Sequence, residues 1–299
     1  MTPGSPAHRD LFCRSFIESH MAFEPETLPW PVVEGDLLAM LRAFPFWSYA
    51  RSIEERSGQM VERFAESLDD PLIREAVGVQ AIEEFRHERL MAQVLTRYGI
   101  DAPRLPVFDT RATREDFLVF GFGECTDVFV GLGAFTIARR KQLLPDSFFD
   151  IFALLLFEEA RHVVFFINWW RYEEARAGRG GFARRNLQAL RYHVKAAMGT
   201  VGNAPSTPMP KLEGAFAEAF TDVSPAVFLE SALGAYRETM NKFDRRLVRP
   251  TLMPAIANVV LALIRMLPPR DHATGAPAST VAIPTIAPAA VGAATNGRH

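Results

Sequence analysis

The chain contains one short pattern twice, as AIEEFRH at residues 81–87 and as LFEEARH at residues 156–162. Each copy places a glutamate three residues before a histidine. Residues three apart lie on one face of an α-helix, one turn from each other, so both side chains can reach a single ion. A lone Glu-x-x-His is weak evidence, because about half a match is expected by chance in a chain of this composition. Two copies of the longer form Glu-Glu-x-Arg-His are far harder to explain by chance. The pairs are Glu84 with His87 and Glu159 with His162.

Both copies lie within long helical patterns, and no stretch shows the sustained two-residue alternation of a β-strand. Asp70 followed by Pro71 is a typical helix start, with an N-cap residue and then a proline in the first turn. We predict four helices joined by a short, a long and a short connection, which suits an antiparallel bundle. They run from about 36 to the break at 69–71, from 71 to 99, from 113 to 143 and from 146 to 177.

Both Glu/His pairs lie in the middle of otherwise apolar helix faces. A carboxylate buried there without a partner would be forced to protonate or would destabilise the fold, and a metal ion removes that problem. Glu83 and Glu158 fall beside these faces, and we interpret them as carboxylates that support the ligands or lie at the surface. Arg86 and Arg161 either pair with them and orient the ligand helices or form ordinary ion pairs at the helix surface. The alternative is two histidine–glutamate pairs that satisfy each other in the core without a metal.

If the bundle binds metal, the first and third helices should each supply a carboxylate at the same height. Glu54 shares its helix face with apolar residues, whereas Glu55 lines up with Arg51, so we predict Glu54 as the ligand. In the third helix Glu124 lies on the apolar face. Asp127, one turn away, is a candidate acceptor for the distal nitrogen of a ligand histidine.

The combined set resembles the metal site of the ferritin-like di-iron carboxylate superfamily, in which two helices give one Glu each and two give Glu-x-x-His. The resemblance covers roughly residues 40–175. It implies an all-α fold: a ferritin-like antiparallel four-helix bundle with additional C-terminal helices. It also implies two Fe ions or a Mn/Fe pair, since oxygen donors with two imidazoles suit iron or manganese. Four carboxylates would balance the charge of two divalent ions. The expected metal ligands are Glu54, Glu84, His87, Glu124, Glu159 and His162.

The sequence divides into four parts. Proline-containing residues 1–35 are predicted to form an arm over the body, residues 36–177 the di-metal bundle, and residues 178–267 accessory helices packed on it. Residues 268–299 are mostly Pro, Ala, Thr and Gly and are predicted to be a disordered tail. The apolar stretch 251–267 is too short for a spanning helix of about 20 residues. We favour a helix packed on the bundle, with peripheral membrane contact as the second interpretation.

Composition excludes several classes of protein. Apolar residues make up 48% and charged residues 23%, which is ordinary for a globular protein and excludes a wholly disordered chain. The formal net charge of −2 gives no electrostatic case for nucleic acid as the main partner. Cys13 and Cys125 cannot form a disulfide framework, and the first residues lack the basic-then-apolar run of a signal peptide. We therefore expect a cytoplasmic protein.

The 24 phenylalanines bear on function, because several are predicted to surround the metals with apolar surface. Such a lining suits an organic substrate and excludes water. The resemblance then implies a non-haem di-iron oxidoreductase that activates O2 to hydroxylate, N-oxygenate or desaturate a small, largely apolar organic molecule, using an external electron donor. The alternative is a ferroxidase, iron-binding or peroxide-scavenging ferritin-like protein. The glycines of the third predicted helix leave room either for substrate or for close helix packing, and assembly as a homodimer stays open.

Overall fold

The structure, a computed structural model, describes residues 2–44, 47–102, 112–202 and 220–266. Every regular element in these ranges is a helix, which confirms the all-α prediction. Residues Met1–Met266 form one compact unit. The tail predicted at residues 268–299 lies outside the described residues.

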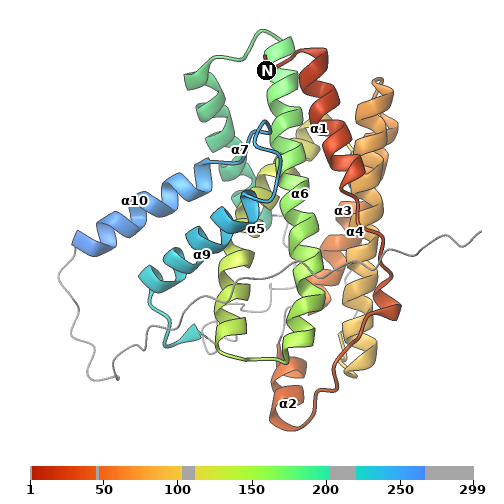
Figure 1. Ribbon diagram of the computed structural model, residues 1–299, viewed down its shortest axis with the longest axis vertical. Coiled ribbons are helices and arrows are strands. Elements are labelled where there is room, and N and C mark those ends of the chain that lie inside the picture. The colour runs from red at the N-terminus through yellow and green to blue at the C-terminus, as the bar shows by residue number, and fades with distance from the viewer. Residues whose placement is uncertain (1, 45–46, 103–111, 203–219, 267–299) are drawn as a thin grey trace, which may run out of the picture. The chain divides into compact units, whose positions relative to one another are not determined.

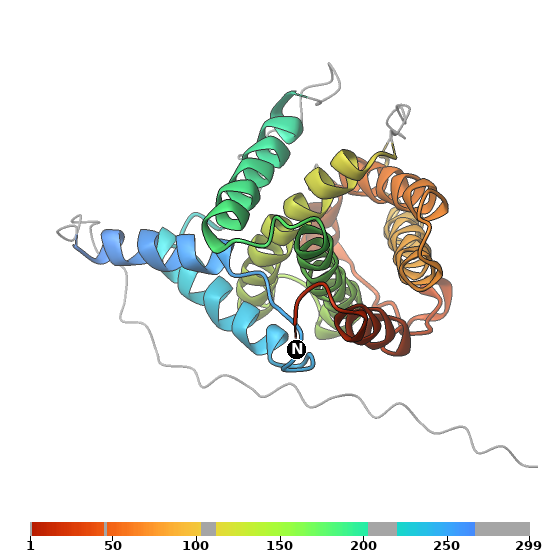
Figure 2. The same cartoon turned by 90° about the horizontal axis from the view of Figure 1, so that it is seen from above.

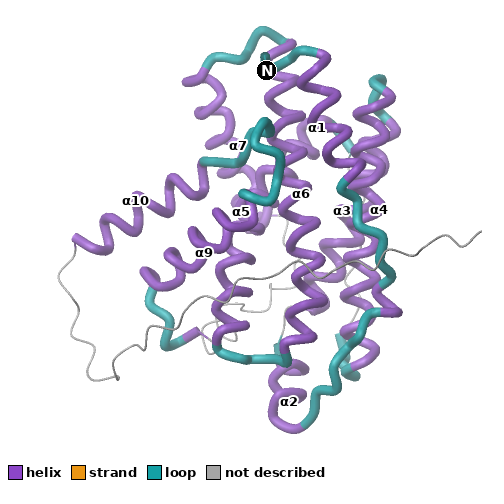
Figure 3. Tube along the Cα trace, in the orientation of Figure 1, coloured by secondary structure: helices purple, strands orange, loops and turns teal. Residues whose placement is uncertain are grey.

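Two antiparallel helix pairs hold the repeated motif (Figure 1). Helices α3 (Trp47–Glu66) and α4 (Pro71–Arg97) are joined by a short turn and pack along each other. Helices α5 (Arg114–Arg140) and α6 (Asp146–Arg176) are joined in the same way. The tube view in Figure 3 shows how short these two turns are beside the long helices.

Local sequence signals explain where the motif helices begin and end. The Asp70 side chain accepts hydrogen bonds from the backbone N–H groups of Leu72 and Ile73, at 3.0 and 3.2 Å, and so caps α4 as predicted. Gly99 follows the end of α4 with φ 57°, a conformation that glycine adopts without strain. Thr113 and Asp116 form a reciprocal capping box at the start of α5.

The first predicted helix is two helices in the structure, α2 (Gly35–Ala43) and α3. Phe44 has extended backbone angles, φ −72° and ψ 114°, at the end of α2. The next residue in the sequence is proline, which disfavours the helical conformation of the residue before it and so explains the break. Among the predicted accessory helices, α9 spans Pro225–Met240.

The proline-containing arm holds a helix that the sequence analysis did not predict, α1 (Pro6–Glu18). Ser5 caps it by accepting a hydrogen bond from the backbone N–H of His8, and Pro6 occupies the first turn. Phe12, Cys13 and Phe16 are buried where α1 packs on α4 and α6. A one-turn 3-10 helix, η1 (Pro25–Thr27), follows it along α4.

Three further helices lie on the α5 side of the bundle, away from α3 and α4 (Figure 2). They are α7 (Phe182–Gly202), α9 and α10 (Leu252–Met266). Among the described residues, only α5 is long and apolar enough to cross a membrane, and 56% of its most apolar window is buried in the bundle. We therefore treat α5 as a core helix.

Two glycines of α5 serve close packing. A Cβ at Gly121 would collide with the ring of Phe166 on α6, and a Cβ at Gly133 would lie 2.7 Å from Cβ of Ala232 on α9. Any larger side chain would push these helices apart. Of the two interpretations of these glycines, close packing therefore holds at both positions.

Candidate metal centre

The six predicted ligands come from four helices and meet between two hydrophobic clusters of the core. The N-terminal half of α4 packs in one cluster and its C-terminal half in the other. Both histidines are fully buried, and Glu84 is 1% exposed. Glu54 comes from α3, Glu84 and His87 from α4, Glu124 from α5, and Glu159 and His162 from α6.

One group of ligand atoms surrounds His87. Its Nδ1 lies 2.9 Å from a Glu159 oxygen and 3.7 Å from a Glu54 oxygen. Glu84 completes this group, in which one ligand atom from each of the four residues lies within 4.8 Å of the others. The choice of Glu54 rather than Glu55 as the inward residue is thus consistent with the geometry.

A second group surrounds His162. Its Nδ1 lies 3.2 Å from Glu84, 3.7 Å from Glu159 and 3.9 Å from Glu124. Glu84 belongs to both groups, and Glu159 directs one oxygen toward each histidine. Two neighbouring positions that share two carboxylates are the arrangement expected of a two-metal site.

The distal nitrogen of each histidine contacts a glutamate on the other helix of the α4–α6 pair. His87 Nε2 on α4 lies 3.1 Å from a Glu158 oxygen on α6, and His162 Nε2 on α6 lies 2.8 Å from a Glu83 oxygen on α4. Both glutamates are fully buried, so neither lies at the surface. They take the role that the sequence analysis offered to Asp127. Periodicity did not find this pairing, because it depends on how α4 and α6 face each other.

Two buried arginines also link α4 and α6. Arg86 on α4 donates to Glu158, and Arg161 on α6 donates to Glu83 at 2.6 Å. Burial alone would raise the pKa of Glu83, but its hydrogen bond from His162 and the charge of Arg161 hold that pKa at about 2. Both arginines are at least 95% buried, so these are not the surface ion pairs that the sequence analysis considered.

We call the two crossing glutamates and the two arginines the outer layer of the centre. Residues 16–23, at and after the end of α1, cover it. Arg161 donates to the Phe16 carbonyl at 2.6 Å and to the Ser19 hydroxyl at 3.0 Å. His20 Nδ1 lies 2.6 Å from a Glu83 oxygen, and the ring of Phe23 lies 4.3 Å from the Arg86 guanidinium. None of these residues belongs to a motif, so the sequence gives no signal for this contribution.

The proximal nitrogens provide a test of whether the residues fit a metal. When a ring is neutral and its Nε2 donates to the crossing glutamate, Nδ1 presents a lone pair to the centre. Both Nδ1 atoms are buried, and carboxylate oxygens lie 2.9 Å from that of His87 and 3.2 Å from that of His162. A nitrogen and a carboxylate this close need a cation between them, either a proton on the ring or a metal ion. The donor set therefore fits a metal, and without one the rings themselves would carry the protons.

Without a bound cation, burial and the neighbouring carboxylates shift the pKa values of the acids and histidines of the centre. Burial raises the pKa of Glu54 to about 8 and, with the neighbouring carboxylates, holds the pKa of Glu124 well above its usual range. Burial alone would lower the pKa of His87 and His162, but the surrounding carboxylates outweigh it and raise both. A bound metal would have to displace these protons.

The formal charges of the centre and its outer layer can be compared with the charge that bound cations would bring. Arg86 and Arg161 supply two positive charges to the six carboxylates of the centre and its outer layer. With both histidines neutral, two divalent cations would bring the total to zero, whereas a single one would leave two uncompensated negative charges in the core. The six carboxylates are Glu54, Glu83, Glu84, Glu124, Glu158 and Glu159.

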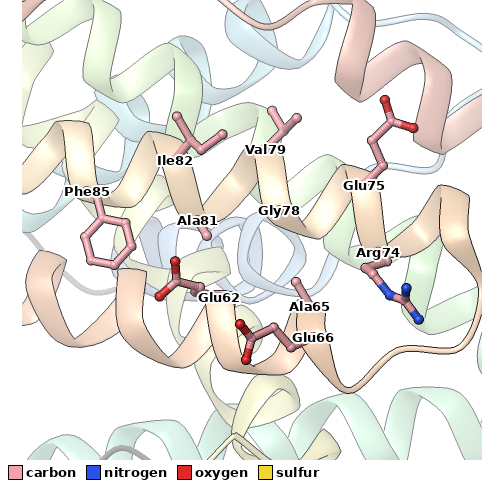
Figure 4. A pocket seen from close by; sticks show the side chains of 10 residues that line it. All are labelled: Glu62, Ala65, Glu66, Arg74, Glu75, Gly78, Val79, Ala81, Ile82 and Phe85. Atoms are coloured by element: carbon pink, nitrogen blue, oxygen red, sulfur yellow. The ribbon is translucent and has the colours of Figure 1, made fainter.

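A groove of about 460 Å³ lies on the outer side of α3 and α4 (Figure 4). Ala65, Ala81 and Phe85 form part of its apolar wall, and Glu62 and Arg74 lie at its rim. None of the six predicted ligands lines it. The groove is therefore separate from the candidate metal centre.

Comparisons of the chain with models of protein families, with curated proteins and with solved structures give no match. The findings that describe this chain are thus its all-helical fold and its buried Glu/His groups, which are able to hold a metal.

Proposed function

We propose that this protein is a ferritin-like, non-haem di-iron oxidoreductase that uses O2 to oxidise a small, largely apolar organic molecule. The single observation that carries the proposal is that two buried histidine Nδ1 atoms converge on shared carboxylates, with Glu84 in both groups and one Glu159 oxygen directed toward each histidine. Manganese could replace one iron, because both metals accept this donor set. When bound, two reduced metals side by side supply the electrons for O2 reduction, and an external donor restores them.

Some of the predicted ligands would hold one metal each, and others lie between the two metal positions. His87 with Glu54 would hold one ion and His162 with Glu124 the other, while Glu84 and Glu159 lie between the two positions. Glu54 and Glu159 are the more exposed carboxylates, with side chains 15% and 14% exposed. They have the most freedom to change orientation when a substrate approaches.

The outer layer fixes the imidazoles. Glu158 and Glu83 would hold each ring with Nδ1 directed inward, and Arg86 and Arg161 donate to these two carboxylates and so fix their positions. Such partners raise the basicity of a ligand histidine and fix its orientation.

Aromatic side chains near the centre support the choice of an organic substrate. On one side Phe117 and Phe166 pack edge to face, with ring centroids 5.9 Å apart. On the other, Trp47 and Phe152 lie 6.3 Å apart. Apolar walls exclude water from a reactive centre, whereas a path for iron mineral would need acidic residues.

Metal analysis combined with O2 consumption tests the proposal. The protein is loaded anaerobically with Fe(II), freed of unbound iron and mixed with O2 and a chemical reductant. We expect two Fe per chain and O2 uptake that accelerates with an organic substrate. Uptake of many irons per chain with assembly into a shell would establish the storage function instead, and no bound metal would reject both functions.

A further inference from the structure

Helix α10 exposes most of its apolar surface. Ala257 and Leu261 are its only buried residues, and both pack against the core cluster. Soluble proteins rarely leave a contiguous apolar face of this kind in water, and such faces commonly mark an interaction site. Five large apolar side chains are 39–78% exposed: Ile256, Val259, Val260, Leu263 and Met266.

Helix α7 carries a second exposed apolar stripe. Its opposite face, with Ala189, Tyr192 and Ala196, is buried and packs toward α5. Spacings of three and four residues place the exposed side chains on one face of the helix. They are Leu187, Leu190, Val194 and Met198, between 46% and 70% exposed.

The two helices are close to each other in the fold. They contact each other and α5, and both leave the bundle on the side away from α3 and α4 (Figure 2). The α7–α10 surface, as we name these two exposed stripes, is therefore remote from the α3–α4 groove.

Charge identifies what the α7–α10 surface fits. Residues 177–202 and 241–266 contain ten basic side chains and one acidic one, in a chain whose net charge is −2. Four of the ten form ion pairs with carboxylates: Arg179, Lys195, Arg246 and Arg265. Helix α7 has no acidic residue, and Arg184 and Arg191 are exposed beside its apolar stripe. Aliphatic side chains flanked by arginines are typical of helices that lie in the interface of an anionic membrane.

The same charges disfavour two other occupants. A second copy would bring the exposed Arg184 and Arg191 of two α7 helices together, and like charges across an interface are costly. Single-stranded nucleic acid would need aromatic side chains for its bases to stack on, whereas the exposed stripes are aliphatic.

We propose that α7 and α10 dock this protein peripherally on an anionic lipid bilayer. The apolar stripes would enter the boundary between headgroups and acyl chains, and the arginines would remain at the level of the headgroups. At 15 residues α10 is shorter than the about 20 needed to span a bilayer, so it lies on the membrane. This inference is independent of the metal centre.

Co-sedimentation of the full chain with vesicles tests it. One set of vesicles is phosphatidylcholine alone, and the other contains phosphatidylglycerol as well. We expect at least about tenfold tighter binding to the anionic vesicles, with the difference lost at high salt. Equal weak binding to both sets, or none, would overturn the proposal.

Variants separate the apolar and electrostatic contributions. Leu190→Asp with Leu263→Asp should abolish binding, and Arg184→Glu with Arg191→Glu should weaken binding to anionic vesicles only. Val32→Asp is the matched control, because Val32 is 81% exposed and lies outside the α7–α10 surface. Circular dichroism melting checks that each variant folds, since these side chains are exposed. Self-association that the Leu variants abolish, without vesicle binding, would reject the lipid surface in favour of a second copy.

Discussion

The two halves of the candidate metal centre share a sequence motif but differ in what covers them. In the half around His162 of α6, Glu83 contacts His162, Arg161 and His20. Arg161 also donates to the Phe16 carbonyl of α1 and to the hydroxyl of Ser19, which follows α1. In the half around His87 of α4, Glu158 contacts His87 and Arg86. Arg86 lies against the Phe23 ring, and its Nε has no partner among the described residues.

The difference shows that a repeated motif does not make equivalent sites. The two Glu/His pairs follow from the repeat, and each histidine Nδ1 lies close to the glutamate of the other pair, at 2.9 and 3.2 Å. The outer layer depends on α1, whose C-terminal end lies over the Glu83–Arg161 pair. We therefore expect the metal position beside His162 to be the more rigid of the two.

Removal of a ligand histidine should have the largest effect on this comparison. His87→Ala and His162→Ala each take away the only imidazole of one group, so affinity at that position should fall by more than the about 10–100-fold typical of outer partners. Metal content measured by elemental analysis should drop to one ion per chain or fewer. His193→Ala, outside both groups, is the control. Retention of two ions in either variant would refute the ligand assignment.

A change of pH should affect metal affinity in both halves alike, because both contain groups that a metal must deprotonate. Because the pKa values of His87 and His162 are raised and that of Glu54 is about 8, these groups carry protons at neutral pH when no cation is bound. Metal binding releases the protons, so affinity should rise with pH, about tenfold per unit for each proton released. Calorimetry in buffers of different ionisation enthalpy measures the number of protons. Affinity that does not change between pH 6 and pH 8 (about two units below and near the Glu54 value) would contradict this.

Replacement of the crossing glutamates should separate the two halves. Glu83→Gln and Glu158→Gln should each lower affinity at the histidine they support by about 10–100-fold. Each variant also leaves a buried arginine without its nearest carboxylate, Arg161 in Glu83→Gln and Arg86 in Glu158→Gln, and breaking a buried pair costs about 3–5 kcal/mol of folding stability. Glu83→Gln should destabilise the protein more, because Glu83 also contacts His20. Metal titration and denaturant unfolding of both variants measure the two effects. A smaller effect of Glu83→Gln than of Glu158→Gln on unfolding would reverse the proposed order of rigidity.

His20→Ala should give the smallest effect, confined to one half. His20 is partly exposed and touches Glu83 but no ligand, so its loss should weaken metal binding beside His162 a few-fold, as expected for a single outer hydrogen bond. Visible absorption of the Co(II) form can distinguish the two positions. Phe23→Leu, which alters the contact with Arg86, is the matched variant for the other half. Identical spectra for His20→Ala and the unaltered protein would show that the segment after α1 does not influence the centre.

The sequence alone determined the helical core of this protein and the identity of the inner residues that meet there. Helix caps such as Asp70 and the three-residue spacing of Glu84 and His87 are local properties, set by the geometry of a single helix. The apolar face was enough to select Glu54 over Glu55 for the same reason.

Only the tertiary structure decided which partners surround those residues. Glu83 and Glu158 lie at the edge of their helix faces, where periodicity allows either solvent or a neighbouring helix. The packing of α4 against α6 buries both glutamates and places each beside the histidine of the other helix. The same holds for α1 and for the exposed stripes of α7 and α10, because burial there depends on contacts between segments far apart in the chain. Local geometry is encoded residue by residue, whereas these contacts exist only once the whole core is assembled.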